Sequence, residues 1–287
     1  MRRLINTALR EDRAHRDRTS RAVLPPALRI RARLIAKAPG VLAGVQAAAM
    51  VFTALDPSLR CRLHRSSGAR LAPGTPLLTI DGRARSIFAA ERTALNLLSH
   101  LSGIATLTAA YVRQVRGTKA VILDTRKTLP GLRGLEKDAV RAGGGRSHRA
   151  DLAEAILIKT NHLRALQRSA FSVQRAKVIQ QAVNKVKRAY PNKPVEVEVV
   201  NLAEFKAALA ARPRMVLLDN WSLPDIRKAV SLRNCTLHAK RSTLALEVSG
   251  GVTLANVRAI ARAGVDRISI GRLTHSAPAL DMALRVQ

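Results

Sequence analysis

The chain has 287 residues, 47% of them hydrophobic, which is enough to bury a substantial core in one large or two modest domains. Its formal net charge of +31, from 50 Lys and Arg against 19 Asp and Glu, would ordinarily point to nucleic acid. The basic residues are nevertheless spread along the whole chain and aromatic residues make up only 2%, so composition argues against nucleic acid as the primary partner.

The N-terminal stretch lacks the pattern of an export signal, because Glu11 and Asp12 stand where a secretory peptide would need its apolar region. The apolar stretch 41–55 is shorter than the roughly 20 residues that span a bilayer. Cys61 and Cys235 have no CxxC or Cys/His spacing, so we expect neither a disulfide framework nor a zinc site. We expect a soluble, cytoplasmic protein.

The first hundred residues are divided by Gly and Pro into short pieces, with strands expected around 31–38 and 75–80. Residues 89–101 have apolar positions at helical spacing, and Gly103 is expected to loosen the chain before a second helical stretch that ends near Val115. We therefore expect a small α+β domain over residues 1–103, with segment 276–287 returning to it.

From residue 120 onward, a strand, a polar loop and a helix alternate about six times, which predicts a parallel sheet in a domain over residues 104–275. Helices are expected at 174–189, 202–211, 223–230 and 254–263. Periodicity does not choose between an open doubly wound sheet and a barrel. Six strands fall short of eight, so a strand is hidden or the barrel is incomplete.

Each of these apolar strands ends in a charged or glycine-rich cluster. Arg126 and Lys127 follow VILD, Lys159 follows AILI, and Asp219 follows MVLL. In an α/β barrel the carboxyl ends of the strands meet around one cavity. Because the cluster is rich in Arg, Lys and His, it indicates an anionic substrate, although each basic residue taken singly could be an ordinary surface charge.

The strand VEVEV carries two glutamates, Glu196 and Glu198, on the same face, so periodicity cannot choose between them. A salt bridge to a barrel lysine is an alternative role for Glu196. Ser249, Gly250 and Gly271 follow the last strands, where bare backbone amides can approach a phosphate. Thr253 is expected to cap the helix that follows.

Eight blocks occur in order along the chain: ERTALNLLSHLSGIAT, DTRKTLPGLRGLEK, GGGRSHR, LIKTNH, VEVEV, LLDN, SGG and GRLTHSAPALD. With them the chain resembles the quinolinate phosphoribosyltransferase family over nearly its whole length. The resemblance implies an N-terminal α+β domain packed on an incomplete parallel α/β barrel, of the type II phosphoribosyltransferase kind. It also implies transfer of phosphoribosyl from phosphoribosyl pyrophosphate to quinolinate, with release of pyrophosphate and CO2.

The resemblance implies roles for individual residues as well. Lys127, Lys159, Glu198 and Asp219 would be catalytic, and Glu198 and Asp219 would hold Mg²⁺, directly or indirectly. The implied substrate-binding residues are Arg92, Arg126, His148, Arg149, Ser249, Gly250, Gly271 and His275. The family also implies a homodimer in which Arg92 comes from the neighbouring subunit, and it implies neither nucleic acid nor a membrane as partner.

The chain departs from the family pattern at three positions near these residues. Relatives usually have Asp at Thr160, Asn at Ser147 and a small residue at Arg272. Loss of a carboxylate at Thr160 puts the support of Lys159 and the metal geometry in question. Two alternative functions remain open: a basic nucleic-acid or anion-binding protein on the same fold, and a nicotinate phosphoribosyltransferase that does not decarboxylate.

Overall fold

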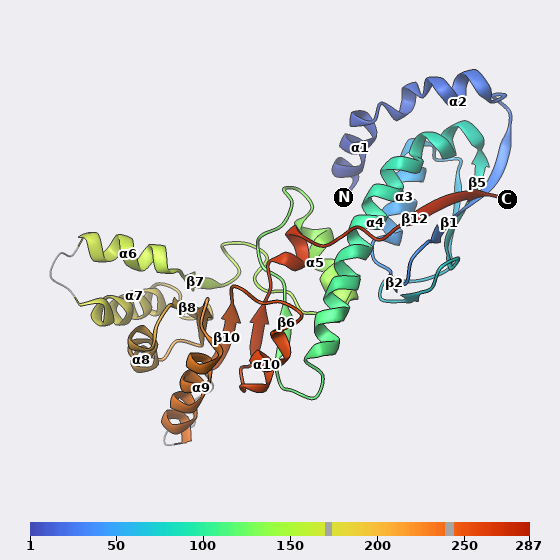
Figure 1. Ribbon diagram of the computed structural model, residues 1–287. Helices are drawn as coiled ribbons and strands as arrows, with labels where there is room; N and C mark the ends of the chain where they lie inside the picture. Colours follow the sequence, from blue (N-terminus) through green and yellow to red (C-terminus); the bar gives the residue numbers. More distant parts are fainter. Residues whose placement is uncertain (170–173, 239–243) are drawn as a thin grey trace. The chain divides into compact units, whose positions relative to one another are not determined.

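The computed structural model describes residues 1–169, 174–238 and 244–287. It is an α/β structure that divides into two compact units (Figure 1). The N-terminal unit comprises residues 1–109, 127–145 and 272–287, and the barrel unit comprises residues 110–126 and 146–271. The expected α/β fold class is confirmed, with an antiparallel sheet in the first unit and a parallel six-stranded sheet in the second.

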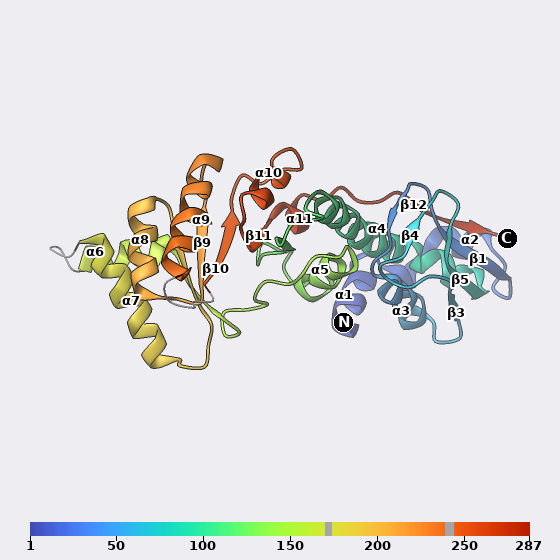
Figure 2. The same ribbon diagram turned by 90° about the horizontal axis from the view of Figure 1, so that it is seen from below.

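The N-terminal unit is built on a four-stranded antiparallel sheet with the order β12-β1-β5-β3 (Figure 2). These strands are β1 (Arg29–Ala36), β3 (Arg60–Leu63), β5 (Pro76–Arg83) and β12 (Met282–Val286). A separate pair joins β2 (Gly40–Val41) to β4 (Arg70–Leu71). The helices are α1 (Arg2–Glu11), α2 (Arg18–Val23), α3 (Val45–Leu55), α5 (Arg133–Ala142) and α11 (Arg272–His275), with a short 3-10 turn at Ala14–Arg16. The last strand, β12, thus brings the C-terminal segment against β1.

One face of this sheet packs on the core of the unit. Ala32 and Leu34 on β1 and Ile80 on β5 are fully buried, and they lie in one cluster with Phe52 of α3 and Leu98 of α4 (Ala84–Gln114). Burying a side chain of this size contributes about 1.5–3 kcal/mol. The alternation of small or apolar residues with arginines along β1 therefore decides which face of the sheet turns inward.

Helix α4 runs without interruption from Ala84 to Gln114, so the expected break at Gly103 is wrong. Gly103 has a different role. A Cβ atom there would lie 2.1 Å from the backbone oxygen of Pro278, so only glycine lets the C-terminal segment come this close to the helix. The Leu280 N–H also donates to the Ser99 carbonyl at 2.9 Å. Glycine in a helix interior costs about 1 kcal/mol, which the helix tolerates when packing on both sides holds it.

The same helix is long and apolar enough to cross a membrane by length and composition alone. Its apolar positions, however, lie in the core of the N-terminal unit, where Ile87, Ala90 and Ala94 are fully buried. This helix is therefore a core helix of the N-terminal unit.

The barrel unit contains a sheet with the order β6-β11-β10-β9-β8-β7, in which every neighbouring pair is parallel. The strands are β6 (Val121–Leu123), β7 (Ile156–Ile158), β8 (Val195–Val199), β9 (Met215–Asp219), β10 (Ala245–Ser249) and β11 (Arg267–Ser269). Among the described residues no strand pairs β6 with β7, so the expectation of an incomplete barrel is confirmed.

The helices of this unit follow the strands in chain order (Figure 1). They are α6 (Thr160–Ser169), α7 (Arg175–Ala189), α8 (Leu202–Ala211), α9 (Leu223–His238) and α10 (Val257–Arg262). Helix α8 has the expected bounds, and α9 continues beyond the expected end at residue 230. The expected start of the last helix at 254 is wrong: Thr253 is not its cap, because Asn256 accepts from the Thr253 N–H and donates to the Gly251 carbonyl, which holds 254–256 as a turn.

The two faces of this sheet differ in chemistry. Val195, Val197 and Val199 of β8 are buried, whereas Glu196 and Glu198 alternate with them and point to the opposite face. Leu217 of β9 lies in register with Glu198 of β8 on one side and with Glu247 of β10 on the other. Asp219 of β9 lies in register with Ser249 of β10. Residues in register share a face, so Glu247 and Ser249 lie on the same polar face as Glu198. One face therefore builds the core, and the other carries acids and hydroxyls.

Candidate active site

The predicted site residues of the barrel unit gather at the carboxyl ends of adjacent parallel strands. Lys159 follows β7, Glu198 lies on β8, Asp219 ends β9, and Ser249 ends β10. Arg126 comes shortly after β6, and Gly271 follows β11. Because all six strands run in the same direction, these ends lie along one edge of the sheet.

Glu198 is held by the backbone at the start of the neighbouring helix. The Thr160 N–H donates to Glu198 Oε1 at 2.9 Å. Although Thr160 stands where relatives usually have Asp, its backbone amide thus still contacts the carboxylate of Glu198. The Thr160 hydroxyl is buried and, within the described part of the chain, has no hydrogen-bond partner. Trp221 Nε1 donates to the Val199 carbonyl at 3.0 Å and anchors the end of the strand that carries Glu198.

Asp219 and Gly250 are joined through Asn220. Asn220 has a φ of 59°, its N–H donates to the Ser249 carbonyl at 2.9 Å, and its side-chain nitrogen donates to Asp219 Oδ2 at 3.1 Å. Gly250 has a φ of 83°, and a Cβ there would lie 2.2 Å from Asn220 Oδ1. Only glycine fits this position, so the SGG turn is shaped by close contact with the end of β9.

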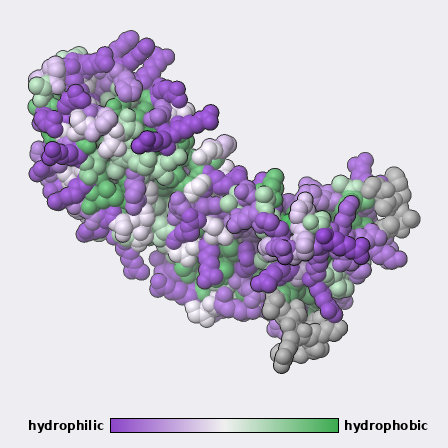
Figure 3. Space-filling model, turned by 180° about the vertical axis from the view of Figure 1, so that it is seen from behind, coloured by the Kyte–Doolittle hydropathy of each residue, from purple (hydrophilic) through white to green (hydrophobic). Residues whose placement is uncertain are grey.

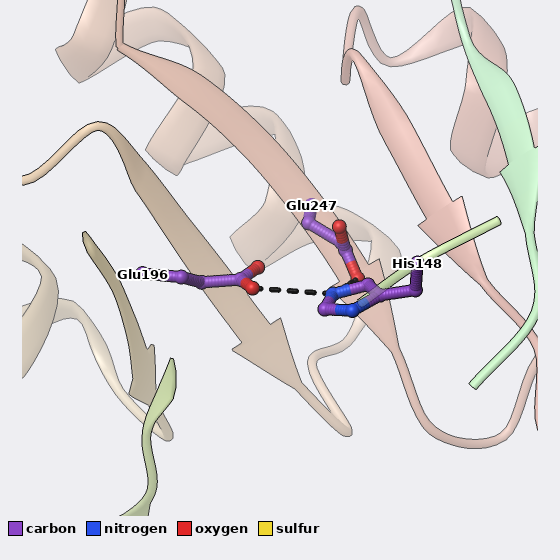
Figure 4. Close-up of side chains that lie close together, drawn as sticks. All are labelled: His148, Glu196 and Glu247. Carbon is purple, nitrogen blue, oxygen red and sulfur yellow. Dashed lines mark ion pairs between the residues drawn. The ribbon is translucent and has the colours of Figure 1, made fainter. Parts of the chain in front are cut away.

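His148 lies in a buried cluster with two glutamates on the polar face of the sheet (Figure 4). Its Nε2 lies 3.2 Å from Glu196 Oε2 and 3.3 Å from Glu247 Oε1. Glu247 also accepts from Arg267 Nε at 2.6 Å. Glu196 thus pairs with a histidine rather than with the lysine expected as its alternative partner.

The backbone fixes the other side of the same ring. The Arg149 N–H donates to His148 Nδ1 at 2.8 Å, and the His148 N–H donates to Asp124 Oδ1 at 2.9 Å. Both ring nitrogens therefore contact protein groups in this conformation. The predicted contact of His148 with a substrate carboxylate stays a prediction.

The pKa values of the cluster reflect burial and charge together. Burial lowers the pKa of His148, but Glu196 and Glu247 outweigh it and raise the pKa to about 9. Burial and the charge of Glu247 raise the pKa of Glu196. Because the Arg149 N–H donates to Nδ1, the ring in this conformation presents its Nε2 proton to the two glutamates.

Arg126 and Arg149 lie close enough for the charge of one to shift the pKa of the other, as an anion-binding site requires. Burial and the positive charge of Arg126 lower the pKa of Arg149, which nevertheless stays protonated in proteins. Arg149 Nη1 donates to the Ala155 carbonyl at 3.0 Å, which directs its side chain along the start of β7. Two neighbouring guanidinium groups fit a ligand with more than one negative charge.

Three predicted residues belong to the N-terminal unit. Arg92 lies on α4 and lines a cavity of about 350 Å³ together with Asn96 and His100. The Thr274 hydroxyl donates to the Lys127 carbonyl at 2.7 Å, so Lys127 and His275 are close although they are far apart in sequence. His275 is exposed at the end of α11.

Glu247 and Asp124 are two site residues that the sequence did not predict. Glu247 is the one charged residue in the apolar run LALEV, and it is fully buried. An acid in the middle of a buried strand is a detectable signal, because such a charge must be paired. Asp124 ends VILD and is fully buried beneath the His148 backbone, a contact that no local pattern reveals.

An incomplete α/β barrel with cations, acids and a glycine turn along one carboxyl edge defines an enzyme that binds a small polyanion. Two family models match: "Quinolinate phosphoribosyl transferase, N-terminal domain" over residues 17–102, and the C-terminal domain of the same name over residues 104–285. The chain belongs to the quinolinate phosphoribosyltransferase family.

Individual relatives agree with this assignment. The chain is 43% identical over 283 residues to a nicotinate-nucleotide pyrophosphorylase [carboxylating] of Mycobacterium leprae, covering 98% of this chain and 95% of the relative. It is 37% identical over 298 residues to a chloroplastic enzyme of that name in Arabidopsis thaliana, covering 99% and 82%. The solved nicotinate-nucleotide pyrophosphorylase of Francisella tularensis is 38% identical with a TM-score of 0.87, covering 99% and 95%.

Proposed function

We propose that this protein transfers the phosphoribosyl group of phosphoribosyl pyrophosphate to quinolinate, releasing pyrophosphate and CO2 and giving nicotinate mononucleotide for NAD biosynthesis. The observation that carries this function is the match of both family domains over nearly the whole chain. The chemistry of the carboxyl edge suits the reaction, because both substrates are polyanions and the edge carries neighbouring guanidinium groups.

Basic residues would hold the two quinolinate carboxylates and the pyrophosphate. Arg126 and Arg149 supply planar forks that match carboxylates, with His148 beside them and Arg92 as a further contributor. Lys127 and Lys159 are compact cations suited to phosphate oxygens near the reacting carbon. The 5-phosphate would bind the amides of Gly250 and Gly271 with Ser249 and His275, where the left-handed turn at Gly250 exposes the backbone.

Glu198 and Asp219 are the acids of the reaction. Departure of pyrophosphate leaves positive character on the anomeric carbon, which a nearby carboxylate stabilises. The two side chains also fit Mg²⁺, because both offer carboxylate oxygens from the ends of adjacent strands and Glu198 uses only Oε1 in its contact with Thr160. When bound, the metal would neutralise charge on the leaving pyrophosphate.

An assay with the purified protein tests the function. With quinolinate, phosphoribosyl pyrophosphate and Mg²⁺, we expect pyrophosphate and CO2 in equal amounts. Replacing quinolinate with nicotinate should give little product, because nicotinate lacks the second carboxylate that the arginines would bind. A folded protein without turnover would overturn the proposal, and equal use of nicotinate would favour the enzyme that does not decarboxylate.

We further propose that the protein acts in the cytoplasm as a homodimer in which Arg92 serves the partner's site. The proposal of a shared site is based on the family resemblance and on the position of Arg92 on a helix that precedes the barrel strands. Arg92→Ala and Arg126→Ala chains should each be inactive alone. Mixed dimers should regain about a quarter to a half of the activity, because one of the two sites is then intact. Confirmed mixed dimers without recovered activity would contradict the shared site.

A further inference from the structure

The N-terminal unit carries a concentration of positive charge on the outer face of its sheet. In β1, Arg29, Arg31 and Arg33 alternate with residues that turn toward the core, and Ala32 and Leu34 among these are fully buried. Successive side chains of a strand point to opposite faces, so the three arginines share the face away from the core.

The register of the sheet adds arginines from the neighbouring strands. Arg33 lies opposite Arg285 of β12 on one side and Thr79 of β5 on the other, and Thr79 lies opposite Arg62 of β3. In the next row, Arg31 and Arg60 both lie opposite Asp81. Residues directly opposite in an antiparallel pair share a face. We call this set the arginine face: Arg29, Arg31, Arg33, Arg60, Arg62 and Arg285.

The charge of the arginine face is barely compensated. Among the described residues of these four strands the one carboxylate is Asp81, and it is bonded to Arg31 Nε at 2.5 Å. Arg83, at the end of β5, does not belong to the arginine face, because its charge is neutralised by Asp56 at 2.9 Å. Burial and the charges of Arg62, Arg33 and Arg65 lower the pKa of His64, which contacts Thr79 Oγ1 at 2.7 Å. The neighbouring histidine thus responds to a positive local potential.

The spacing of the arginines on this face is comparable to the spacing of phosphates along a nucleic-acid duplex. Strands lie about 4.8 Å apart and alternate residues about 6.6 Å apart, so the arginines span about 13 Å along β1 and about 14 Å across the sheet. A nucleic-acid duplex presents one negative charge per about 1.7 Å of axis, so about eight phosphates fit over this length. Guanidinium groups bind phosphate oxygens in pairs of parallel hydrogen bonds.

Other occupants fit this face less well. A second copy that met this face with its own arginine face would oppose arginines with arginines. A membrane surface is held most firmly by apolar side chains that insert, and the exposed side chains of the face are arginines, with Ile35 half-buried. No aromatic residue lies on the four described strands, so bases cannot be stacked and a ligand would be held by its backbone. In the view of Figure 3, hydrophilic side chains cover much of the surface, with hydrophobic patches between them.

We propose that the arginine face binds the phosphate backbone of duplex nucleic acid without reading its sequence, in addition to the enzymatic activity. The sequence argument against nucleic acid rested on basic residues scattered along the chain. The sheet register gathers six of them on one surface. None of them belongs to the candidate active site, so the two activities are separable.

The test is a titration of a labelled 20-base-pair DNA duplex of mixed sequence with the full chain between 50 and 200 mM salt. With five phosphates neutralised, the logarithm of the association constant should fall with a slope of about −4.5 against the logarithm of salt. The triple variant Arg29→Gln, Arg60→Gln, Arg62→Gln should bind about 10–100-fold more weakly at 100 mM salt and reduce the slope by about 3. These three side chains are exposed, so the fold should survive.

A matched control removes the same charge elsewhere. The variant Arg188→Gln, Arg227→Gln, Arg262→Gln changes three exposed arginines of the barrel unit and should bind within about threefold of the parent. Equal losses in both triple variants would show that the total charge, not this face, binds the duplex. Absence of binding at 50 mM salt would overturn the proposal, and so would binding to phosphatidylserine vesicles without binding to the duplex.

Discussion

Replacing Glu198 with glutamine is expected to lower kcat by about 10²–10³-fold while the fold stays intact. The amide oxygen of glutamine can still accept the Thr160 N–H that now donates to Glu198 Oε1 at 2.9 Å, so the local structure is preserved. The negative charge is removed, and with it the stabilisation of the positive character that forms on the ribose carbon. Steady-state kinetics with both substrates measures the effect.

Two further measurements separate this role from a structural one. KM for quinolinate should change much less than kcat, because Glu198 is proposed to act on the sugar carbon rather than on the pyridine carboxylates. Asp281→Asn, which makes the same chemical change at an exposed carboxylate of the N-terminal unit, should leave kcat unchanged. A Glu198→Gln enzyme with a normal rate would remove this residue from the mechanism.

Replacing Glu247 with glutamine is expected to lower the free energy of unfolding by about 3–5 kcal/mol. Glu247 is fully buried and accepts from Arg267 Nε at 2.6 Å while contacting His148 Nε2 at 3.3 Å. The amide would leave the charge of Arg267, whose side chain is three-quarters buried, without its carboxylate partner, and this largely desolvated charge is the main cost. Urea unfolding followed by far-UV circular dichroism gives the change in midpoint.

Arg267→Met in the Glu247→Gln background supplies the control. Removing the second partner takes away the uncompensated charge, so the double variant should be more stable than Glu247→Gln alone. A double variant that is less stable than Glu247→Gln would show that packing, rather than charge pairing, makes Glu247 important. Activity should fall as well, because Glu247 contacts the Nε2 atom of His148, a predicted substrate-binding residue.

Much of the barrel could be predicted from sequence because its signals are local. Short apolar runs such as VEVEV and MVLLD are buried strands, and the polar residues that end them reach the carboxyl edge whatever the details of packing. The departures from prediction have local causes too. The side chain of Asn256 delays the start of α10. Gly103 does not break helix α4 but lies inside it, where the lack of a side chain lets Pro278 pack closely against the helix.

The candidate site was only partly visible from sequence. The family resemblance implied Glu198 and Asp219, whereas alternation alone could not separate Glu198 from Glu196, since both point to the same face. The structure separates them by their partners: Glu198 meets the amide of Thr160, while Glu196 meets His148. Such partners come from other strands and loops, so no window of sequence contains them.

The sequence by itself determined the order of the barrel strands, their polar carboxyl ends and the family, because these depend on residue type, period and ordered motifs. Only the tertiary structure decided which charges become neighbours. Strand pairing joins Glu247 of β10 to Arg267 of β11, and it joins arginines of β1, β3 and β12 into one face. Coulomb energy depends on distance in space, so a chain that looks uniformly basic along its length gathers its charges into distinct clusters when it folds.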